Sequence, residues 1–186
     1  MRWRFIHIPK CGGITFRSAY ADYERALQPT CNTIDCIPPD VRTVAVIRHP
    51  LDRLVSICSF YFGSTAKLDQ WLDSGDWLDR PVFEVEGRPP LRYPSTKLTI
   101  PWSTPQVNWI REETHLILLD DYQRGVDEWA DIAGFPRRRL EVTNTSNRAA
   151  DWREYLSPEH VEQFSEFYAE DLATYGRLLV AAGCKG

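Results

Sequence analysis

Two hydrophobic patterns alternate along this chain and predict its secondary structure. Continuous apolar runs bounded by polar residues, glycine or proline are typical of buried strands, and they occur at residues 3–8, 43–47 and 115–119. Apolar residues three or four positions apart are typical of helices, and they recur at residues 14–25, 51–62, 68–72 and 122–133. Because strands and helices alternate, we predict an α/β fold with a parallel sheet flanked by helices. Ligands of such folds bind at the carboxyl ends of the strands.

A last helix is predicted to begin after Ser157. Serine is a favoured N-cap residue, and Pro158 suits the first turn, where a backbone N–H has no helical partner. The apolar residues that follow have helical spacing, and they are Val161, Phe164, Tyr168, Leu172, Tyr175 and Leu179. We interpret them as the packing face of one helix.

Residues 75–104 have no sustained period and are rich in proline, tryptophan and arginine. A long irregular stretch in a compact domain is usually functional or mobile. Several side chains in and after it are compatible with stacking on a saccharide or with filling the core, and they are Trp77, Tyr93, Lys97, Trp102 and Trp109.

The end of the first predicted strand carries the clearest chemical signal. Residues 9–15 read P-K-C-G-G-I-T, which we call the glycine loop. Glycines let backbone N–H groups approach an anion, the following helix adds the positive end of its dipole, and Lys10 adds a charge. In the common nucleotide loop the lysine follows the last glycine, whereas Lys10 precedes Gly12. The pattern therefore predicts a phosphate-binding loop that is not a Walker A sequence.

A second candidate anion site follows the second predicted strand. Arg48 ends the apolar run, Pro50 ends the strand, and Ser56 lies in the next helix. Since parallel strands end at the same edge of a sheet, we expect Arg48 to lie beside the glycine loop. We interpret Arg53 as structural, in an ion pair with Asp52 or another carboxylate.

Together, P-K-x-G-G-x-T after one strand and R-x-P-x-x-R-x-x-S after another resemble the two cofactor-binding segments of sulfotransferases. These enzymes use 3′-phosphoadenosine 5′-phosphosulfate (PAPS), and the likeness is closest to carbohydrate O-sulfotransferases of the heparan and chondroitin type. The resemblance implies a P-loop-like three-layer α/β/α fold. It also implies transfer of a sulfuryl group from PAPS to an acceptor hydroxyl, which we expect to belong to a saccharide or a small molecule.

By position, the resemblance implies two sets of cofactor contacts. The residues expected to bind the 5′-phosphosulfate are Lys10, Cys11, Gly12, Gly13, Ile14 and Thr15. Arg48 and Ser56 are expected to bind the 3′-phosphate. The family usually reads P-K-T-G-G-T-S, so Cys11 and Ile14 replace two hydroxyl residues, but the backbone donors are unaffected. Further likeness to the family lies in 144–146, 151–155 and 167–176.

Sulfuryl transfer moves negative charge onto the leaving bisphosphate, and Lys10 is expected to stabilise that charge without a metal. The family uses a glutamate or histidine as the general base, commonly between the two segments. This chain has no histidine there, and the candidates are Asp22, Glu24 and Asp35, of which Asp35 in the loop is preferred. We expect His7 to pack beside the loop and His49 to shape the turn.

Two other functions compete with this interpretation. Residues 116–121 read L-I-L-L-D-D, which is similar to the magnesium-binding strand of a P-loop kinase, but such an enzyme needs a hydroxyl directly after its lysine. We therefore interpret this run as a core strand whose acids cap the next helix. A non-catalytic nucleotide-binding or glycan-binding protein is the other alternative.

Length and composition set limits on the remaining possibilities. The chain has 186 residues, 43% of them hydrophobic, which suits a single domain over 1–186. The net charge of −4 argues against a nucleic-acid partner. The chain shows neither a secretory signal nor an apolar stretch of about 18 residues, so we expect a cytoplasmic protein without a membrane anchor. The five cysteines lack zinc-type pairs and are expected to be free thiols.

Overall fold

The computed structural model describes residues 2–23, 27, 37–75, 102–141 and 151–183. Its strands are β1 (Trp3–Ile6), β2 (Arg42–Ile47) and β3 (His115–Leu118). They form a three-stranded parallel sheet in the order β1-β2-β3. The predicted α/β class and the parallel sheet are therefore confirmed.

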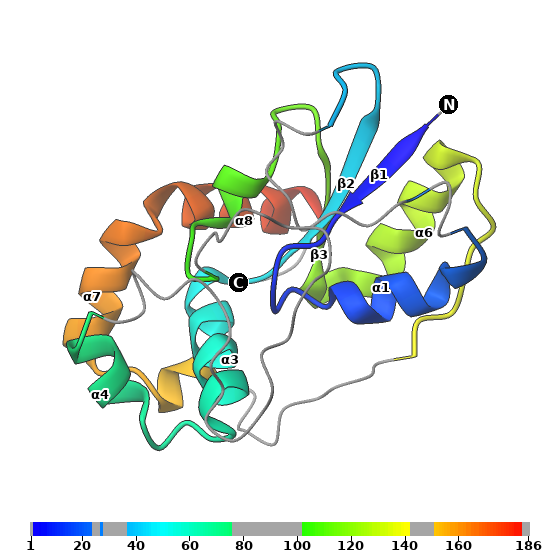
Figure 1. The fold of residues 1–186 in the computed structure, drawn as a ribbon. Helices are drawn as coiled ribbons and strands as arrows, with labels where there is room; N and C mark the ends of the chain where they lie inside the picture. The colour runs from blue at the N-terminus through cyan, green and yellow to red at the C-terminus, as the bar shows by residue number, and fades with distance from the viewer. Residues whose placement is uncertain (1, 24–26, 28–36, 76–101, 142–150, 184–186) are drawn as a thin grey trace.

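Helices follow the strands at nearly the predicted positions (Figure 1). The α-helices are α1 (Gly13–Ala19), α3 (Pro50–Phe62), α4 (Leu68–Asp73), α6 (Tyr122–Ala133), α7 (Pro158–Phe167) and α8 (Ala169–Ala181). The short 3₁₀ turns are η1 (Ala21–Tyr23), η3 (Gln106–Trp109), η4 (Leu119–Asp121) and η5 (Trp152–Glu154). The bounds of α6 are those predicted, and Gly134 ends it in the left-handed conformation that glycine favours (φ 75°).

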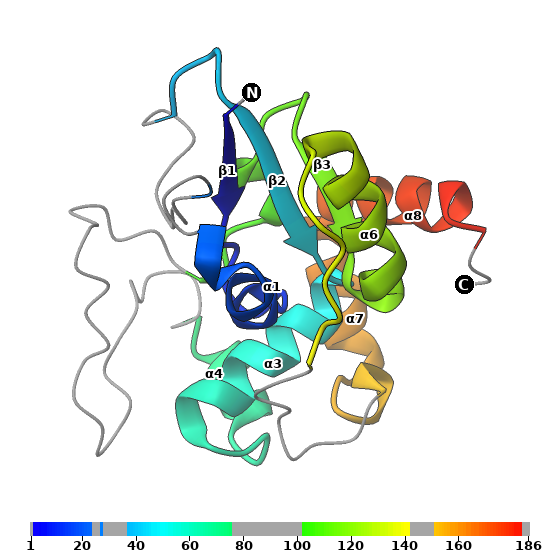
Figure 2. The same cartoon turned by 90° about the vertical axis from the view of Figure 1, so that its right-hand side faces the viewer.

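Helices α1 and α6 cover one face of the sheet, and α8 lies on the other side (Figures 1 and 2). Aromatic side chains fill the first interface. Phe5 of β1 stacks on Phe16 of α1 with ring centroids 4.4 Å apart, and Phe16 lies 5.0 Å from Trp129 of α6. All three are fully buried, so each contributes roughly 2–3 kcal/mol of hydrophobic stabilisation. This packing holds α1, and with it the end of the glycine loop, against β1.

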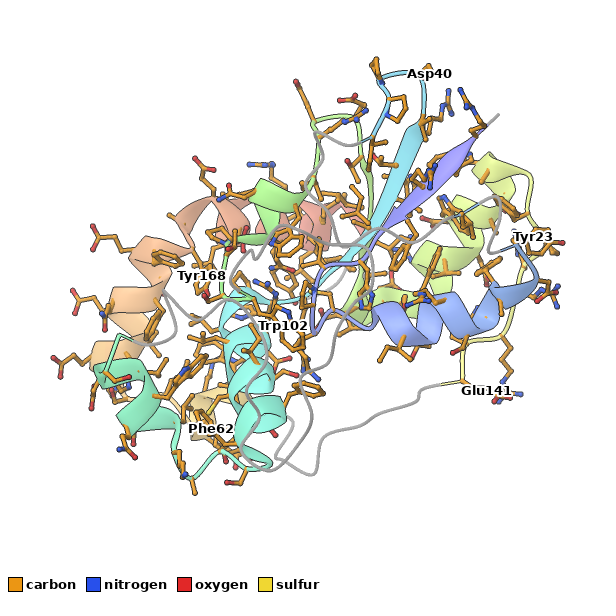
Figure 3. The ribbon with its side chains drawn as sticks, in the orientation of Figure 1. Tyr23, Asp40, Phe62, Trp102, Glu141 and Tyr168 are labelled. Carbon is orange, nitrogen blue, oxygen red and sulfur yellow. The ribbon has the colours of Figure 1, made fainter. Side chains whose placement is uncertain are left out.

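A second hydrophobic cluster lies beside the sheet, between α3, α4 and α7. Its buried residues include Leu54, Trp71, Trp102 and Phe164. Trp102 and Tyr168 lie in the interior in Figure 3, whereas Asp40 and Glu141 lie at the periphery. This cluster supports α3, the helix that follows Arg48.

The prediction of one long C-terminal helix is wrong, because the chain bends at Tyr168 between α7 and α8. Tyr168 leaves helical geometry (φ −101°, ψ 25°), and its buried hydroxyl donates to the Ser103 carbonyl at 2.7 Å. The apolar stripe is consequently divided, with Phe164 in the second cluster and Tyr175 in the core under the sheet. Bending lets each half bury its own apolar residues. Ser157 does cap α7, accepting from the His160 N–H at 3.1 Å.

Helix α1 is also shorter than predicted, since it ends at Ala19 rather than near residue 25. Tyr20 packs edge-on against Trp129 at 5.2 Å and donates its hydroxyl to the Pro136 carbonyl at 3.2 Å. These contacts draw the chain away from the helix axis. Among the described residues, none of the helices is both long enough and apolar enough to cross a bilayer.

Candidate functional site

The glycine loop joins β1 to α1 at the carboxyl edge of the sheet. Lys10 has φ +65°, a left-handed conformation that no other non-glycine residue of the described ranges adopts. This conformation costs roughly 1–2 kcal/mol, so the surrounding structure must impose it. Gly12 is the N-cap of α1 with φ +79°. Because glycine has no side chain, Leu119 can pack against it, and a Cβ added at Gly12 would lie only 2.7 Å from Leu119 Cδ1.

Three side chains from other segments hold the carbonyl groups of the loop. Arg53 Nε donates to the Pro9 carbonyl at 3.0 Å, Arg48 Nη1 donates to the Lys10 carbonyl at 3.1 Å, and Tyr122 Oη donates to the Gly12 carbonyl at 2.8 Å. In a trans peptide the carbonyl and the following N–H point in opposite directions. The N–H groups of Lys10, Cys11 and Gly13 therefore point away from these donors, and this arrangement can present backbone donors to an anion.

Arg53 is a buried cation beneath the loop, with 1% of its surface exposed. Besides Pro9, its guanidinium donates to the carbonyls of Thr104, at 3.0 Å, and Trp102. The structural role predicted for Arg53 is confirmed, but these acceptors are carbonyl groups. Asp52, the expected partner, instead accepts from Arg48 Nε at 2.5 Å.

Arg48 therefore brings the two candidate anion sites together. Arg48 donates to the Lys10 carbonyl, although the two residues are 38 positions apart in the chain. Its side chain is 16% exposed, and it lies directly after β2 and before the N-cap of α3, His49. The expected position of Arg48 beside the glycine loop is confirmed.

One face of α3 runs beside the loop. Asp52, Ser56 and Phe60 are four residues apart and so share that face. The Lys10 ammonium lies 4.3 Å from the centroid of the Phe60 ring, in a cation–π contact. Ser56 is 3% exposed and lies in the second turn of α3. Arg48 thus precedes the N-terminus of α3, Ser56 lies near its middle, and the Lys10 ammonium lies against Phe60 near its C-terminal end.

The other loop residues differ in what they present. The Cys11 side chain is 1% exposed, and its thiol donates to Gln106 Oε1 at 3.1 Å. Burial raises the pKa of this thiol to about 11, so it stays protonated at neutral pH. Thr15 is also buried, whereas Ile14 is 46% exposed. Cys11 can therefore serve an anion through its backbone N–H but not through its side chain.

The two histidines near the loop pack against neighbouring groups, as predicted for His7. His7 is buried against Gly13, where an added Cβ would lie 2.4 Å from His7 Cδ2. Burial, with the charges of Arg17 and Lys10, lowers the pKa of His7 to about 4. His49 stacks on Trp152 with ring centroids 4.9 Å apart, and burial lowers its pKa as well.

The preferred general base, Asp35, lies outside the described residues, as does Glu24. Asp22, the remaining candidate, lies in η1 and pairs with Arg138 at 2.7 Å. Its carboxylate therefore belongs to a surface ion pair.

The strand that resembles a magnesium-binding strand ends in the turn η4. Asp121 occupies the N-cap position of α6, but its carboxylate pairs with Arg124 and makes no cap hydrogen bond. The predicted position is confirmed and the predicted cap bond is wrong. Within the described ranges, no three His, Cys, Asp or Glu side chains are grouped so that they could hold a metal ion.

The aromatic residues named from the sequence that fall within the described ranges, Trp102 and Trp109, are both buried. They fill the core, and the others, Trp77, Tyr93 and Lys97, lie outside the described residues. Cys11 and Cys58 are free thiols, as expected, and both are buried.

Sequence reasoning missed three residues that support the loop, namely Tyr122, Gln106 and Asp171. The sequence pattern predicts Tyr122 only as the first residue of a helix. Asp171 is 2% exposed. It lies in the family-like segment 167–176, but the sequence pattern assigns it no role at the loop. Gln106 follows an irregular stretch, and no pattern in the sequence distinguishes it.

The chain matches no protein-family model, no curated protein and no solved structure. A functional assignment therefore depends on the geometry and chemistry of these residues.

We expect Arg53→Met to lower the free energy of unfolding by about 3–5 kcal/mol, because it removes the donor from several buried carbonyl groups. Urea unfolding measures this loss. Arg124→Met is the matched control, since Arg124 is 46% exposed and pairs with the surface carboxylates of Asp121 and Glu128. An equally small effect of both substitutions would contradict a supporting role for Arg53.

The histidine beneath the loop also makes stability depend on pH. Burial lowers the pKa of His7 from about 6.5 in the unfolded chain to about 4 in the folded chain, so the unfolded state takes up a proton first as the pH falls. The contribution of neutral His7 to the free energy of unfolding is fully present above pH 6.5. We expect the free energy of unfolding to fall by roughly 3 kcal/mol as the pH approaches 4. Denaturant unfolding of wild type and His7→Gln across this range should show a flatter profile for the variant. Parallel profiles would show that His7 is not the group responsible.

Proposed function

We propose that this chain is a PAPS-dependent sulfotransferase with a P-loop-like three-layer α/β/α fold. The observation that carries the proposal is the hydrogen bond from Arg48 Nη1 to the Lys10 carbonyl, 3.1 Å long. It joins the glycine loop to the arginine segment at the carboxyl edge of a parallel sheet, where such folds bind ligands. A donor with phosphate groups at both its 5′ and 3′ positions needs two neighbouring anion sites of this kind.

In the proposed reaction the glycine loop binds the 5′-phosphosulfate. An acceptor oxygen forms a bond to sulfur while the bond from sulfur to the bridging phosphate oxygen breaks. The leaving 3′,5′-bisphosphate takes the electron pair, and the backbone N–H groups together with the Lys10 ammonium stabilise its charge. In this proposal the flexible Lys10 side chain moves from its place over the Phe60 ring toward the leaving oxygen.

Arg48 and Ser56 bind the 3′-phosphate in this proposal. The bonds to Asp52 and Lys10 use two of the five N–H donors of the Arg48 guanidinium, and its remaining donors can meet phosphate oxygens. Asp52 holds the guanidinium in place beside the loop. Ser56, on the face of α3 toward the loop, adds a hydroxyl donor.

The acceptor hydroxyl transfers its proton to a carboxylate, for which Asp35 remains our candidate. A saccharide acceptor remains the proposal from the sequence resemblance.

The side chain directly after the lysine favours sulfuryl transfer over phosphoryl transfer. A P-loop kinase places a serine or threonine hydroxyl there to bind magnesium. Here that position is Cys11, whose thiol is buried and bonded to Gln106. In the glycine loop the lysine precedes the glycines, so in this proposal the Lys10 ammonium acts beside the backbone N–H donors.

We expect Lys10→Ala to lower turnover at least about 100-fold, because it removes a charge that acts on the leaving group. The assay follows labelled sulfate from PAPS into a panel of saccharide and small-molecule acceptors, with chelator present. Lys67→Ala is the matched control, since its ammonium also lies over an aromatic ring of α3, Phe62, at 5.7 Å. Near-normal turnover by Lys10→Ala would show that the lysine does not act on the leaving group. If wild type transfers sulfate to none of the acceptors, the result argues against the proposed sulfotransferase activity.

A further inference from the structure

The side chain of Gln106 continues the sheet where its strands stop pairing. The last pair between β2 and β3 is Ile47 with Leu118. At the next residue, the Arg48 N–H donates to Gln106 Oε1 at 3.0 Å, and Gln106 Nε2 donates to the Arg48 carbonyl at 2.9 Å. The amide thus supplies the donor and the acceptor that a neighbouring strand would supply.

The same amide reaches the glycine loop and the C-terminal helix. Its oxygen also accepts from the Cys11 thiol at 3.1 Å, and its nitrogen lies 3.4 Å from Asp171 Oδ2. Two donors therefore meet Oε1 and two acceptors meet Nε2, which uses the full capacity of a glutamine side chain. Gln106 is only 2% exposed, so water cannot replace these partners.

Asp171 holds Gln106 in this position. Its carboxylate, on α8, accepts from the backbone N–H of Gln106 at 2.7 Å and of Val107 at 2.9 Å. Both N–H groups belong to the first turn of η3, whose donors have no partner within the turn itself. The backbone and the side chain of Gln106 are therefore both anchored to one carboxylate.

We propose that Gln106 is a positioning residue that sets the place of Arg48, and so determines the preference for a 3′-phosphorylated nucleotide. This inference rests on the proposed function. Gln106 does not itself reach the phosphate. It acts by holding the Arg48 backbone on one side and Cys11 of the glycine loop on the other, so that the two anion sites keep a constant separation.

The isosteric change Gln106→Glu tests this role most sharply. A carboxylate oxygen in place of Nε2 faces the Arg48 carbonyl and the Asp171 carboxylate, and both contacts become repulsive. Gln106→Met is the second variant, since it removes the hydrogen bonds without adding charge. Gln123→Glu is the matched control, because this exposed amide also bonds backbone groups, at Arg138 and Leu140.

The measurement compares the affinities for 3′-phosphoadenosine 5′-phosphate and for adenosine 5′-phosphate. We expect both Gln106 variants to reduce the preference for the first nucleotide at least about tenfold, and Gln123→Glu to leave it unchanged. Faster hydrogen exchange of the Arg48 amide is expected in the same variants. An equal loss of affinity for both nucleotides, or no loss, would overturn the inference.

The exchange measurement separates this inference from the proposed function. If wild type binds neither nucleotide, the proposed function fails, while the Arg48 amide still reports whether Gln106 holds it. Unchanged exchange in Gln106→Met, with the fold retained by circular dichroism, would then show that Gln106 does not position Arg48.

Discussion

A charged group buried inside the protein determines the shape of the candidate site. The Arg53 guanidinium is 1% exposed and donates to the carbonyls of Pro9, Trp102 and Thr104. Taking such a cation out of water is costly, and the cost is offset only when several acceptors surround it. The carbonyl dipoles serve this purpose, and they belong to two segments far apart in the chain. Folding around Arg53 therefore fixes the glycine loop against the segment that carries Gln106.

The rest of the site follows from this attachment. With the Pro9 carbonyl held by Arg53 and the Gly12 carbonyl by Tyr122, the loop between them has little freedom. Lys10 has a left-handed backbone conformation there, and the hydrogen bonds to the Pro9 and Gly12 carbonyls on either side outweigh the cost of that conformation. Contacts within the chain therefore hold the backbone of the loop, and backbone dipoles that are held in place stabilise charge most effectively.

The sequence was sufficient for those features that depend on local pattern. Apolar runs and helical spacing predicted the strands, their parallel arrangement and the bounds of α6, because burial imposes these periods. The adjacency of Lys10 and Arg48 also followed, since parallel strands end at one edge of the sheet.

Features that depend on contacts between distant side chains and backbone could not be predicted. The bend at Tyr168 depends on a hydrogen bond to Ser103, and the acceptors of Arg53 belong to segments without a hydrophobic period. The role of Gln106 depends on where η3 approaches the end of β2. Single polar residues leave no periodic signal, so only the folded arrangement reveals such roles.

We propose that the two adjacent anion sites suit a nucleotide phosphorylated at both positions. Calorimetric titration of wild type and Arg48→Ala, with chelator present, tests it most directly. The ligands are 3′-phosphoadenosine 5′-phosphate and adenosine 5′-phosphate. We predict that wild type binds the bisphosphate at least about tenfold more tightly and that Arg48→Ala loses this preference, because the arginine fork acts on the 3′-phosphate. Equal affinity of wild type for the two nucleotides would rule out a separate site for the 3′-phosphate.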